Sequence, residues 1–344
     1  MASRASRKGY LPFFLLLLPL GTGSLFAQQP PSHLSPPPQS EGPPGKFQES
    51  LDATVGAIRE NNPRLKDLSP QYVQGLTEFV SGNMLFVLLH EMAHVAITQM
   101  GLPVLGRTED AADTYAALRL IRSGSNFSHR VLIEAAEGWF LADRRDQKMG
   151  DKVSYYDEHG LNQQRAYQIV CLMIGSDDER FKDLARQTNL PDERRDGCAG
   201  DYSNAAYSWD LVLKPHQREP DQPKTSIEVI YGPAEDRVKT ARQVASSIRL
   251  LETVAEHAAD EFLWPSSFTL EMQSCGFPNA HWDLPSHTLT LCYELATEFA
   301  DLYRNYADAR ADGSATVDSS KRRTINASAF EATRQQIHRK PKRR

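Results

Sequence analysis

The sequence predicts an α+β protein that is mostly helical and carries a small sheet of about three strands. From Leu51 to about Gln187, apolar residues recur at three- and four-residue spacing, which is typical of helices packed against a core. Farther along the chain, three short segments alternate between apolar and polar residues, as strands do. A run of helices followed by a group of strands is typical of the α+β class.

Helix boundaries are clearest in the first part of the chain. The segment SPQYVQGLTEFVSG places Ser69 as an N-cap and Pro70 at the first helical position. An apolar helix continues from Gly82 to Met100, and another is expected from about Thr108 to Arg122. Further helices are expected near residues 128–147, 158–174 and 177–188.

A polar stretch with cysteine and proline separates these helices from the strand-like part. There TSIEVIYG, SSFTLEMQSC and HTLTLCY alternate like strands. The first two flank a long helix predicted from Pro233 to Phe262. A last helix is expected from Glu294 to about Arg310.

The composition is that of a globular protein with an ordinary solvated surface. Of 344 residues, 40% are apolar and 24% are charged, and 44 acids face 39 bases. A strongly basic face would indicate a nucleic-acid or anionic membrane partner, and this balance indicates neither. We therefore expect no nucleic-acid partner; the sequence leaves the oligomeric state open.

The two ends of the chain differ from its middle. Residues 1–27 are typical of a signal peptide, with basic residues followed by the apolar run LPFFLLLLPL and a cleavage site after Ala27. The apolar run is short for a membrane span, and an uncleaved anchor is the alternative. We expect an exported protein, periplasmic or extracellular, with no stable membrane span after signal removal. A Pro-rich linker (28–48), one domain (49–310) and a basic, disordered tail (311–344) follow.

Export changes the interpretation of the cysteines. The chain has four, an even number, and an oxidising compartment favours two disulfides over four free thiols. Three pairings are possible. We favour Cys171 with Cys198 and Cys275 with Cys292, because each pair falls within one local segment and closes a modest loop.

Two histidines and a glutamate interrupt the most apolar helix. His90, Glu91 and His94 form the pattern H-E-x-x-H. On a helix the two histidines lie one turn apart on the same face and can bind one metal ion, with the glutamate beside a water on that metal. Such polar residues in an apolar helix are costly unless something satisfies them. The pattern predicts a Zn²⁺ site of the hydrolase type, and hydrogen-bonded core histidines are the alternative.

A catalytic zinc usually takes a third protein ligand, and the segment EDAAD offers candidates. Glu109 and Asp113 are four residues apart and share one face of a second helix. One carboxylate would bind the metal, and the other would hydrogen-bond a ligand histidine and fix its tautomer. The residues alone leave the choice open, because acids are also common in the first turn of a helix.

An auxiliary proton donor is harder to find in the sequence. His159 is the first candidate, with Asp157 near enough to orient it, and Tyr115 is the second. A residue at a helix N-terminus, in DEHG, is the alternative interpretation of His159. His281 and His287 have no ligand-like spacing with a carboxylate, and we expect them at the surface. The hairpin NAHWD either lines a peptide groove as an added strand or only packs, and packing is favoured.

The motif HEMAH, followed on a second helix by E-x-x-x-D, resembles the gluzincin branch of the zincin metallopeptidases. LLHEMAH, LPVLGRTEDAAD, DEHGLNQQRAYQIVCLMIGS and NAHWDLPSHTLTLCYEL together resemble a family of exported bacterial metallopeptidases of otherwise unassigned function. The resemblance covers the chain from about Val80 to Tyr303. It implies a zincin-like fold, with His90 and His94 as metal ligands and Glu109 as the third ligand. In the resemblance, Asp113 supports a histidine and Glu91 is the general base.

One feature departs from the zincin pattern. Zincins place their sheet before the active-site helix, whereas every strand-like segment here follows it. The sheet therefore either has rearranged connectivity or packs elsewhere.

Two functions are consistent with these residues. The first is an exported zinc-dependent metallopeptidase that hydrolyses peptide bonds of peptides or proteins through a metal-activated water, with Glu91 as general base. The second is a non-catalytic envelope protein that uses a zincin-like scaffold to bind peptides or a partner protein. The intact Glu91 favours the first, since a binding protein has no evident need for a base beside two ligands.

Overall fold

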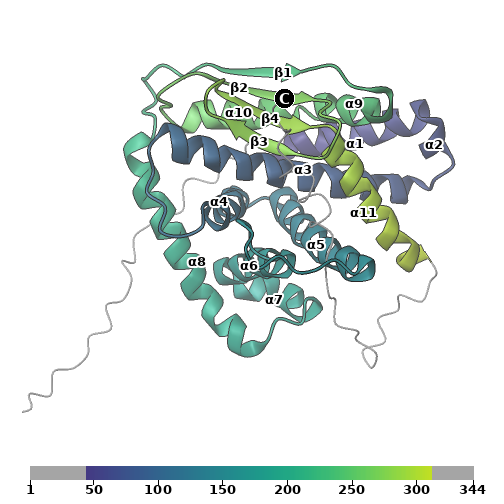
Figure 1. Cartoon of the computed structure of the whole chain (residues 1–344), viewed down its shortest axis with the longest axis horizontal. Helices are drawn as coiled ribbons and strands as arrows, with labels where there is room; N and C mark the ends of the chain where they lie inside the picture. Colours follow the sequence, from purple (N-terminus) through teal and green to yellow (C-terminus); the bar gives the residue numbers. More distant parts are fainter. Residues whose placement is uncertain (1–43, 312–344) are drawn as a thin grey trace, which may run out of the picture. The chain divides into compact units, whose positions relative to one another are not determined.

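The computed structural model describes residues 44–311 (Figure 1). These residues belong to one unit of the chain. The predicted signal peptide (1–27) and all of the predicted basic tail (311–344) except Ala311 lie outside the described residues. Of the predicted linker (28–48), the described part already belongs to the first helix, α1 (Pro44–Asn61).

The chain is mostly helical, with a small mixed sheet, as predicted. The first part comprises α1, α2 (Pro63–Lys66), α3 (Pro70–Gln99), α4 (Thr108–Ser123), α5 (Asn126–Met149), α6 (Asn162–Ser176), α7 (Asp178–Gln187) and α8 (Asp192–Leu213). The second comprises η1 (Lys214–His216), β1 (Ile227–Tyr231), η2 (Asp236–Val238), α9 (Lys239–Ser247), α10 (Leu250–Glu261), β2 (Phe268–Gln273), β3 (Ala280–Asp283), β4 (Thr288–Cys292) and α11 (Glu294–Ala311).

Helix α3 contacts most of the other elements. It begins as predicted, with the hydroxyl of Ser69 accepting a hydrogen bond from the backbone N–H of Tyr72 at 3.1 Å. It contacts α1, α4, α5, α10 and α11 and the strands β3 and β4, and Figure 1 shows it between the sheet and the helices α4 to α8. By length and composition α3 could cross a membrane, but 72% of its most apolar window is buried in the fold. A helix apolar on all sides and buried in this way is a core helix.

The sheet has four strands in the order β1-β2-β4-β3, one more than the three predicted. The additional strand is β3, which lies in the NAHWD segment. Strands β1, β2 and β4 run parallel, and β3 pairs with β4 in the antiparallel direction. Leu270, Leu289 and Leu291 are fully buried, and both β3 and β4 contact α3. The sheet therefore packs on the helix that carries the H-E-x-x-H pattern, although it follows that helix in the chain.

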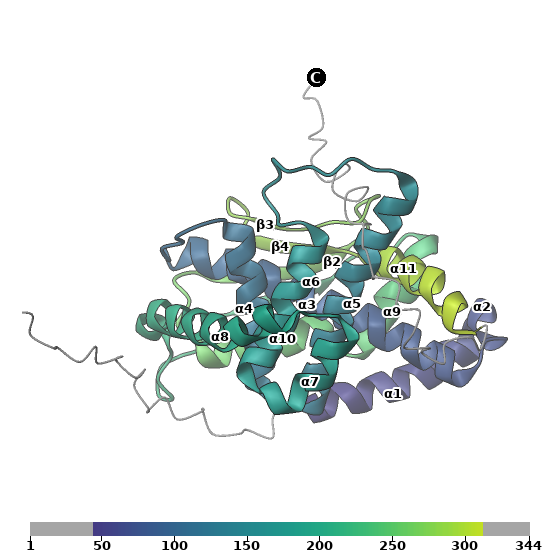
Figure 2. The same cartoon turned by 90° about the horizontal axis from the view of Figure 1, so that it is seen from below.

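The prediction of one long helix from Pro233 to Phe262 is wrong. The chain forms η2, α9 and α10 there, and it breaks between the last two at Arg249, whose backbone is left-handed (φ 56°). The break lets α9 pack on α1 while α10 packs on β1 and α3. In Figure 2, α9 lies toward α11 and α10 toward α8. One straight helix could not reach both surfaces.

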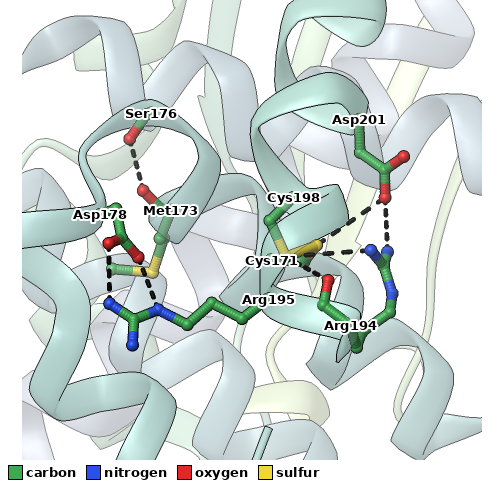
Figure 3. The surroundings of a disulfide bond; sticks show 8 residues. All are labelled: Cys171, Met173, Ser176, Asp178, Arg194, Arg195, Cys198 and Asp201. Atoms are coloured by element: carbon green, nitrogen blue, oxygen red, sulfur yellow. Dashed lines mark hydrogen bonds and ion pairs between the residues drawn. A yellow bond between two sulfur atoms is a disulfide. The ribbon is translucent and has the colours of Figure 1, made fainter. Parts of the chain in front are cut away.

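Helix α8 was not predicted, because it carries few apolar residues at helical spacing. Only Cys198, Trp209 and Leu213 are buried along its 22 residues. The disulfide between Cys171 on α6 and Cys198 joins it to the core (Figure 3). Arg194 pairs with Asp201 along α8 beside this disulfide.

Both predicted disulfides are present in the structure. Besides Cys171 with Cys198, Cys275 pairs with Cys292 and ties the segment after β2 to the end of β4. No free cysteine is found among the described residues. Two disulfides indicate folding in an oxidising environment.

The close approach of α6 and α8 predicts the effect of one substitution. A Cβ added at Gly175 would overlap the backbone carbonyl of Cys198 and the side chain of Tyr202. Since backbone cannot move aside easily, Gly175→Ala should destabilise the protein by about 1–3 kcal/mol. Urea or thermal unfolding measures this.

Gly200→Ala on α8 is the matched control, because no atom lies within 4 Å of the added Cβ. Alanine is the better helix former by up to about 1 kcal/mol, so this variant should be as stable as the wild type or more stable. Equal stability of the two variants would contradict the close packing of α6 on α8.

Candidate metal centre

The H-E-x-x-H residues lie in the last third of α3, toward the C-terminal end of its buried part. His90 and Glu91 are 4% and 8% exposed, and His94 is partly buried. One helical turn separates the two histidines, which brings their rings together edge to face with their Nε2 atoms 3.2 Å apart. Two imidazole nitrogens at this distance converge on one point.

Helix α4 turns back along α3 and brings two carboxylates to these histidines. The Oε2 atom of Glu109 lies 3.1 Å from His90 Nε2 and 3.5 Å from His94 Nε2. The Oδ1 atom of Asp113 lies 2.8 Å from the other ring nitrogen of His90, Nδ1. The structure therefore brings Glu109 to the point where the two histidines converge, and Asp113 to the far side of His90.

The spacing of these atoms fits a metal ion. Bonds of 2.0–2.1 Å in a tetrahedral zinc site place neighbouring ligand atoms about 3.3 Å apart. The three separations among His90 Nε2, His94 Nε2 and Glu109 Oε2 are 3.1, 3.2 and 3.5 Å. Two imidazoles and a carboxylate are also donors that bind such an ion.

The hydrogen bond to Asp113 fixes which nitrogen of His90 is free. An ionised carboxylate can only accept, so Nδ1 carries a hydrogen, and in the neutral imidazole Nε2 presents its lone pair toward Glu109 and His94. A lone pair directed at a carboxylate is unfavourable unless a proton or a cation lies between them. The tautomer thus suits a metal ligand.

The electrostatics of the cluster favour positive charge at this point. Burial lowers the pKa of His90, but hydrogen bonds to Asp113 and Glu109 outweigh it and raise the pKa to about 9. Burial raises the pKa of Glu109, yet the surrounding histidines hold it well below its usual range. Both shifts have the same cause, since the ionised carboxylates are stabilised by positive charge on the imidazoles. A divalent cation would supply such charge.

Arg165 on α6 holds Asp113 in place. Its Nε and Nη2 atoms donate to the two oxygens of Asp113, each at 2.5 Å. Its guanidinium lies 3.4 Å from the ring centre of Trp139 on α5. Arg165 itself is only 7% exposed. Burial raises the pKa of Asp113, but Arg165 and His90 hold it well below its usual range. Sequence reasoning missed Arg165 and Trp139, because no spacing pattern connects them to α3.

The loop between α5 and α6 brings His159 to the carboxylate of Glu109. Its Nε2 lies 2.7 Å from Glu109 Oε2, and its Nδ1 lies 3.5 Å from Asp157 Oδ1, too far for a good hydrogen bond. Asp157 instead accepts a hydrogen bond from the backbone N–H of His159 at 2.9 Å. A second bond, from Arg107 to the carbonyl of His159, ties this loop to α4.

Tyr115, the second candidate donor, lies elsewhere. It is two residues beyond Asp113 and therefore points about 200° around the helix axis, away from the cluster. Its ring packs on Trp209, with centroids 4.9 Å apart.

A cavity of about 420 Å³ opens beside the cluster. Its walls come from α3, α4, α5, α6, α11, β3 and the loop before α6: Phe86, Val87, His90, Glu91, His94, Thr98, Glu109, Trp139, Glu158, His159, Gly160, Asn162, Arg165, Asn279, Ala280, His281, Trp282 and Leu295. His281 is exposed, as expected, but it lines the cavity, which the sequence did not indicate. Asn279, Ala280 and Trp282 of the NAHWD segment also line the cavity.

Two overlapping groups among the described residues could hold an ion at this point: His90, Glu91 and His94, and His90, Glu109 and His159. A third group, Cys275, Cys292 and Glu294, has both sulfur atoms in a disulfide. The cluster on α3 and α4 is therefore the candidate metal centre.

The sequence profile of a family described as "Putative metallopeptidase" matches residues 55–213 and 231–332, more than half of the chain. The chain belongs to this family. Comparison with curated proteins and with solved structures gave no match. A metallopeptidase family implies a metal ion and peptide substrates. The matched ranges contain every residue of the cluster described above.

The role of Asp113 predicts how metal affinity responds to its loss. Asp113→Asn removes the negative charge shared by His90 and Arg165, so His90 loses its fixed tautomer. Changes of this kind typically weaken metal binding about 10–100-fold. Competition with a chelator, with zinc as the probe ion, measures the dissociation constant.

Arg165→Met tests whether Arg165 positions Asp113 for metal binding, and Arg119→Met is its matched control. Arg119 also lies on a helix of the core and pairs with Glu261, but outside the cavity. We expect Arg119→Met to lower thermal stability and leave zinc affinity unchanged, and Arg165→Met to lower both. Equal zinc affinity in Arg165→Met and wild type would refute the positioning role of Arg165.

Proposed function

We propose that this protein is an exported zinc-dependent metallopeptidase in which Glu91 is the general base. The observation that carries the proposal is the convergence of His90 Nε2, His94 Nε2 and Glu109 Oε2 within 3.5 Å of one another, in a cavity that Glu91 also lines. Membership of a metallopeptidase family supports it. The two disulfides support an oxidising, extracytoplasmic location.

Zinc is the metal that this donor set favours. His90, His94 and Glu109 would be its ligands, and Asp113 would orient His90. Two histidines and one carboxylate, with a further position left for water, are the ligands of many catalytic zinc sites. A zinc ion bound there would lower the pKa of a water molecule and polarise the peptide carbonyl.

Glu91 follows His90 directly on α3 and lines the same cavity. From there its carboxylate takes the proton of the attacking water and delivers it to the leaving amine. Burial of Glu91, which is 8% exposed, keeps competing bulk water away from this transfer.

His159 is the proposed auxiliary donor. It lies on the loop before α6, with its ring 6.1 Å from that of His90 and its Nε2 beside the Glu109 carboxylate. A hydrogen bond from this nitrogen to the carbonyl oxygen under attack would stabilise the negative charge that develops there. Asp157 and Arg107 hold the backbone of His159 in position.

Strand β3 gives a way to hold an extended peptide. It lies at the edge of the sheet and pairs with β4 on one side only among the described strands. Asn279, Ala280, His281 and Trp282 of this region line the cavity. An extended substrate can add to such an edge through main-chain hydrogen bonds.

Replacement of the base separates catalysis from metal binding. Glu91→Gln should retain stoichiometric zinc and lose about 10²–10⁴-fold in peptide cleavage, because an amide cannot accept the proton. His90→Ala should lose both zinc and activity. A peptide-library cleavage assay together with metal analysis gives both readouts.

Glu78→Gln is the control, since Glu78 lies on the same helix outside the cavity. It should match the wild type in zinc content and activity. Zinc-loaded wild type that cleaves no peptide, like Glu91→Gln, would favour the non-catalytic binding protein instead.

His159→Gln tests the auxiliary role separately. The variant should keep its zinc and lose about 10–100-fold in kcat with little change in KM, because the lost hydrogen bond forms mainly in the transition state. Steady-state kinetics on one cleaved peptide measure both constants. A change in KM alone would assign His159 to substrate binding, and loss of zinc would make it a ligand.

A further inference from the structure

A second cavity, of about 220 Å³, lies along the first half of α3. Its walls come from α1, α2, α3, η2, α9, α10, β2 and α11, and none of its lining residues also lines the cavity beside the candidate metal centre. Figures 1 and 2 both show α1, α9 and α11 on the side of the molecule away from α8. This cavity is therefore a separate site, which the proposed peptidase function does not use.

The second cavity is elongated. On α3 its lining residues recur every four positions from Leu76 to Met84, so they follow one face of the helix for about 12 Å. Helix α11 packs on α3 and lines the cavity with the same spacing from Ala296 to Arg304. The alanine side chains on α11 are short, which leaves a long space between the two helices.

The interior of the second cavity is apolar apart from one hydroxyl. Met84 and Met272, which line it, are 3% and 0% exposed. Ser81 lines it too and is 2% exposed, and its hydroxyl has no hydrogen-bond partner among the described residues. One turn earlier, the hydroxyl of Thr77 donates to the carbonyl of Val73 at 2.7 Å. Because buried hydroxyls normally have partners, the unpaired hydroxyl of Ser81 indicates that it faces open space.

The charged residues that line the second cavity, within the described part of the chain, are two exposed arginines. Arg237 is held by two acids, Glu235 and Glu294. Arg304 pairs with Asp301 through one nitrogen, in an exposed pair three residues apart, which contributes little to stability. A guanidinium has five N–H donors, so Arg304 can also bind an anionic ligand.

We propose that the second cavity binds a fatty acid, with the carboxylate on Arg304 and the hydrocarbon chain in the apolar interior. An alkyl chain matches the long, narrow space between α3 and α11. A carboxylate accepts charge-assisted hydrogen bonds from a guanidinium. Each methylene group that leaves water should strengthen binding about fourfold. The site does not depend on peptide hydrolysis, so the outcome of a cleavage assay leaves this inference unaffected.

Titration calorimetry of the purified protein tests the class of ligand. Dodecanoate, kept below the concentration at which it forms micelles, should bind once per chain and at least about tenfold more tightly than octanoate. Dodecyltrimethylammonium has the same chain and the opposite charge, and it should bind at least about tenfold more weakly than dodecanoate. Absence of saturable binding, or equal affinity for the two head groups, would overturn the proposal.

One substitution that fills the cavity locates the chain. Ala300 is half-buried and lines the cavity, so Ala300→Leu should abolish dodecanoate binding. Ala259→Leu on α10 is the matched control, since Ala259 is also half-buried but lies outside the cavity, and its affinity should equal that of the wild type. Unchanged binding in Ala300→Leu would place the ligand elsewhere and overturn the site.

A surface substitution locates the head group without disturbing the fold. Arg304→Gln should weaken dodecanoate binding about tenfold and leave the affinity for dodecyltrimethylammonium no lower. Arg186→Gln is the control, because Arg186 is also exposed and pairs with an acid three residues away, Asp183, but lies outside the cavity. Equal dodecanoate affinity in Arg304→Gln and Arg186→Gln would contradict the role of Arg304.

Two other occupants are distinguished by the same titration. Tighter binding of lysophosphatidylglycerol with the same acyl chain than of dodecanoate would make a phospholipid the ligand in place of a fatty acid. Dodecanoate binding that appears only after residues 312–344 are removed would assign the cavity to that segment of the chain. Either result would overturn the proposal.

Discussion

The carboxylate of Asp113 connects three helices of the core, and the geometry of the candidate metal centre depends on it. It accepts from His90 on α3 and from two nitrogens of Arg165 on α6, while its own helix, α4, carries Glu109. A buried charge that loses one partner typically costs about 3–5 kcal/mol. The same bonds that hold the helices together therefore fix the tautomer of His90 and the position of Glu109.

The cluster also explains how a very apolar helix tolerates buried polar residues in its last third. His90 and Glu91 are buried in α3, where unpaired polar groups would be costly. Around His90, two carboxylates and a second imidazole supply the partners. These groups together favour a cation, which is what the proposed metal site requires.

Local features of the sequence were sufficient to predict part of the fold and part of the candidate site. Ser69 and the apolar run after it identify α3, and four-residue spacing pairs His90 with His94 and Glu109 with Asp113. Arg165 and Trp139 could not be found, because the contacts of Arg165 with Asp113 and with Trp139 join distant segments and leave no periodic pattern. The predictions for α8 and for the break at Arg249 failed for related reasons. Helix α8 buries few apolar residues, and the break at Arg249 depends on packing against α1 and the sheet.

The central claim is that one zinc ion is held by His90, His94 and Glu109. X-ray absorption at the zinc edge of the purified protein tests it most directly, since it reports the number, type and distance of the ligand atoms. The account predicts one zinc per chain with nitrogen and oxygen ligands only, two of them imidazoles, at about 2.0–2.1 Å. A spectrum with sulfur ligands, or a protein that takes up no stoichiometric zinc, would contradict it.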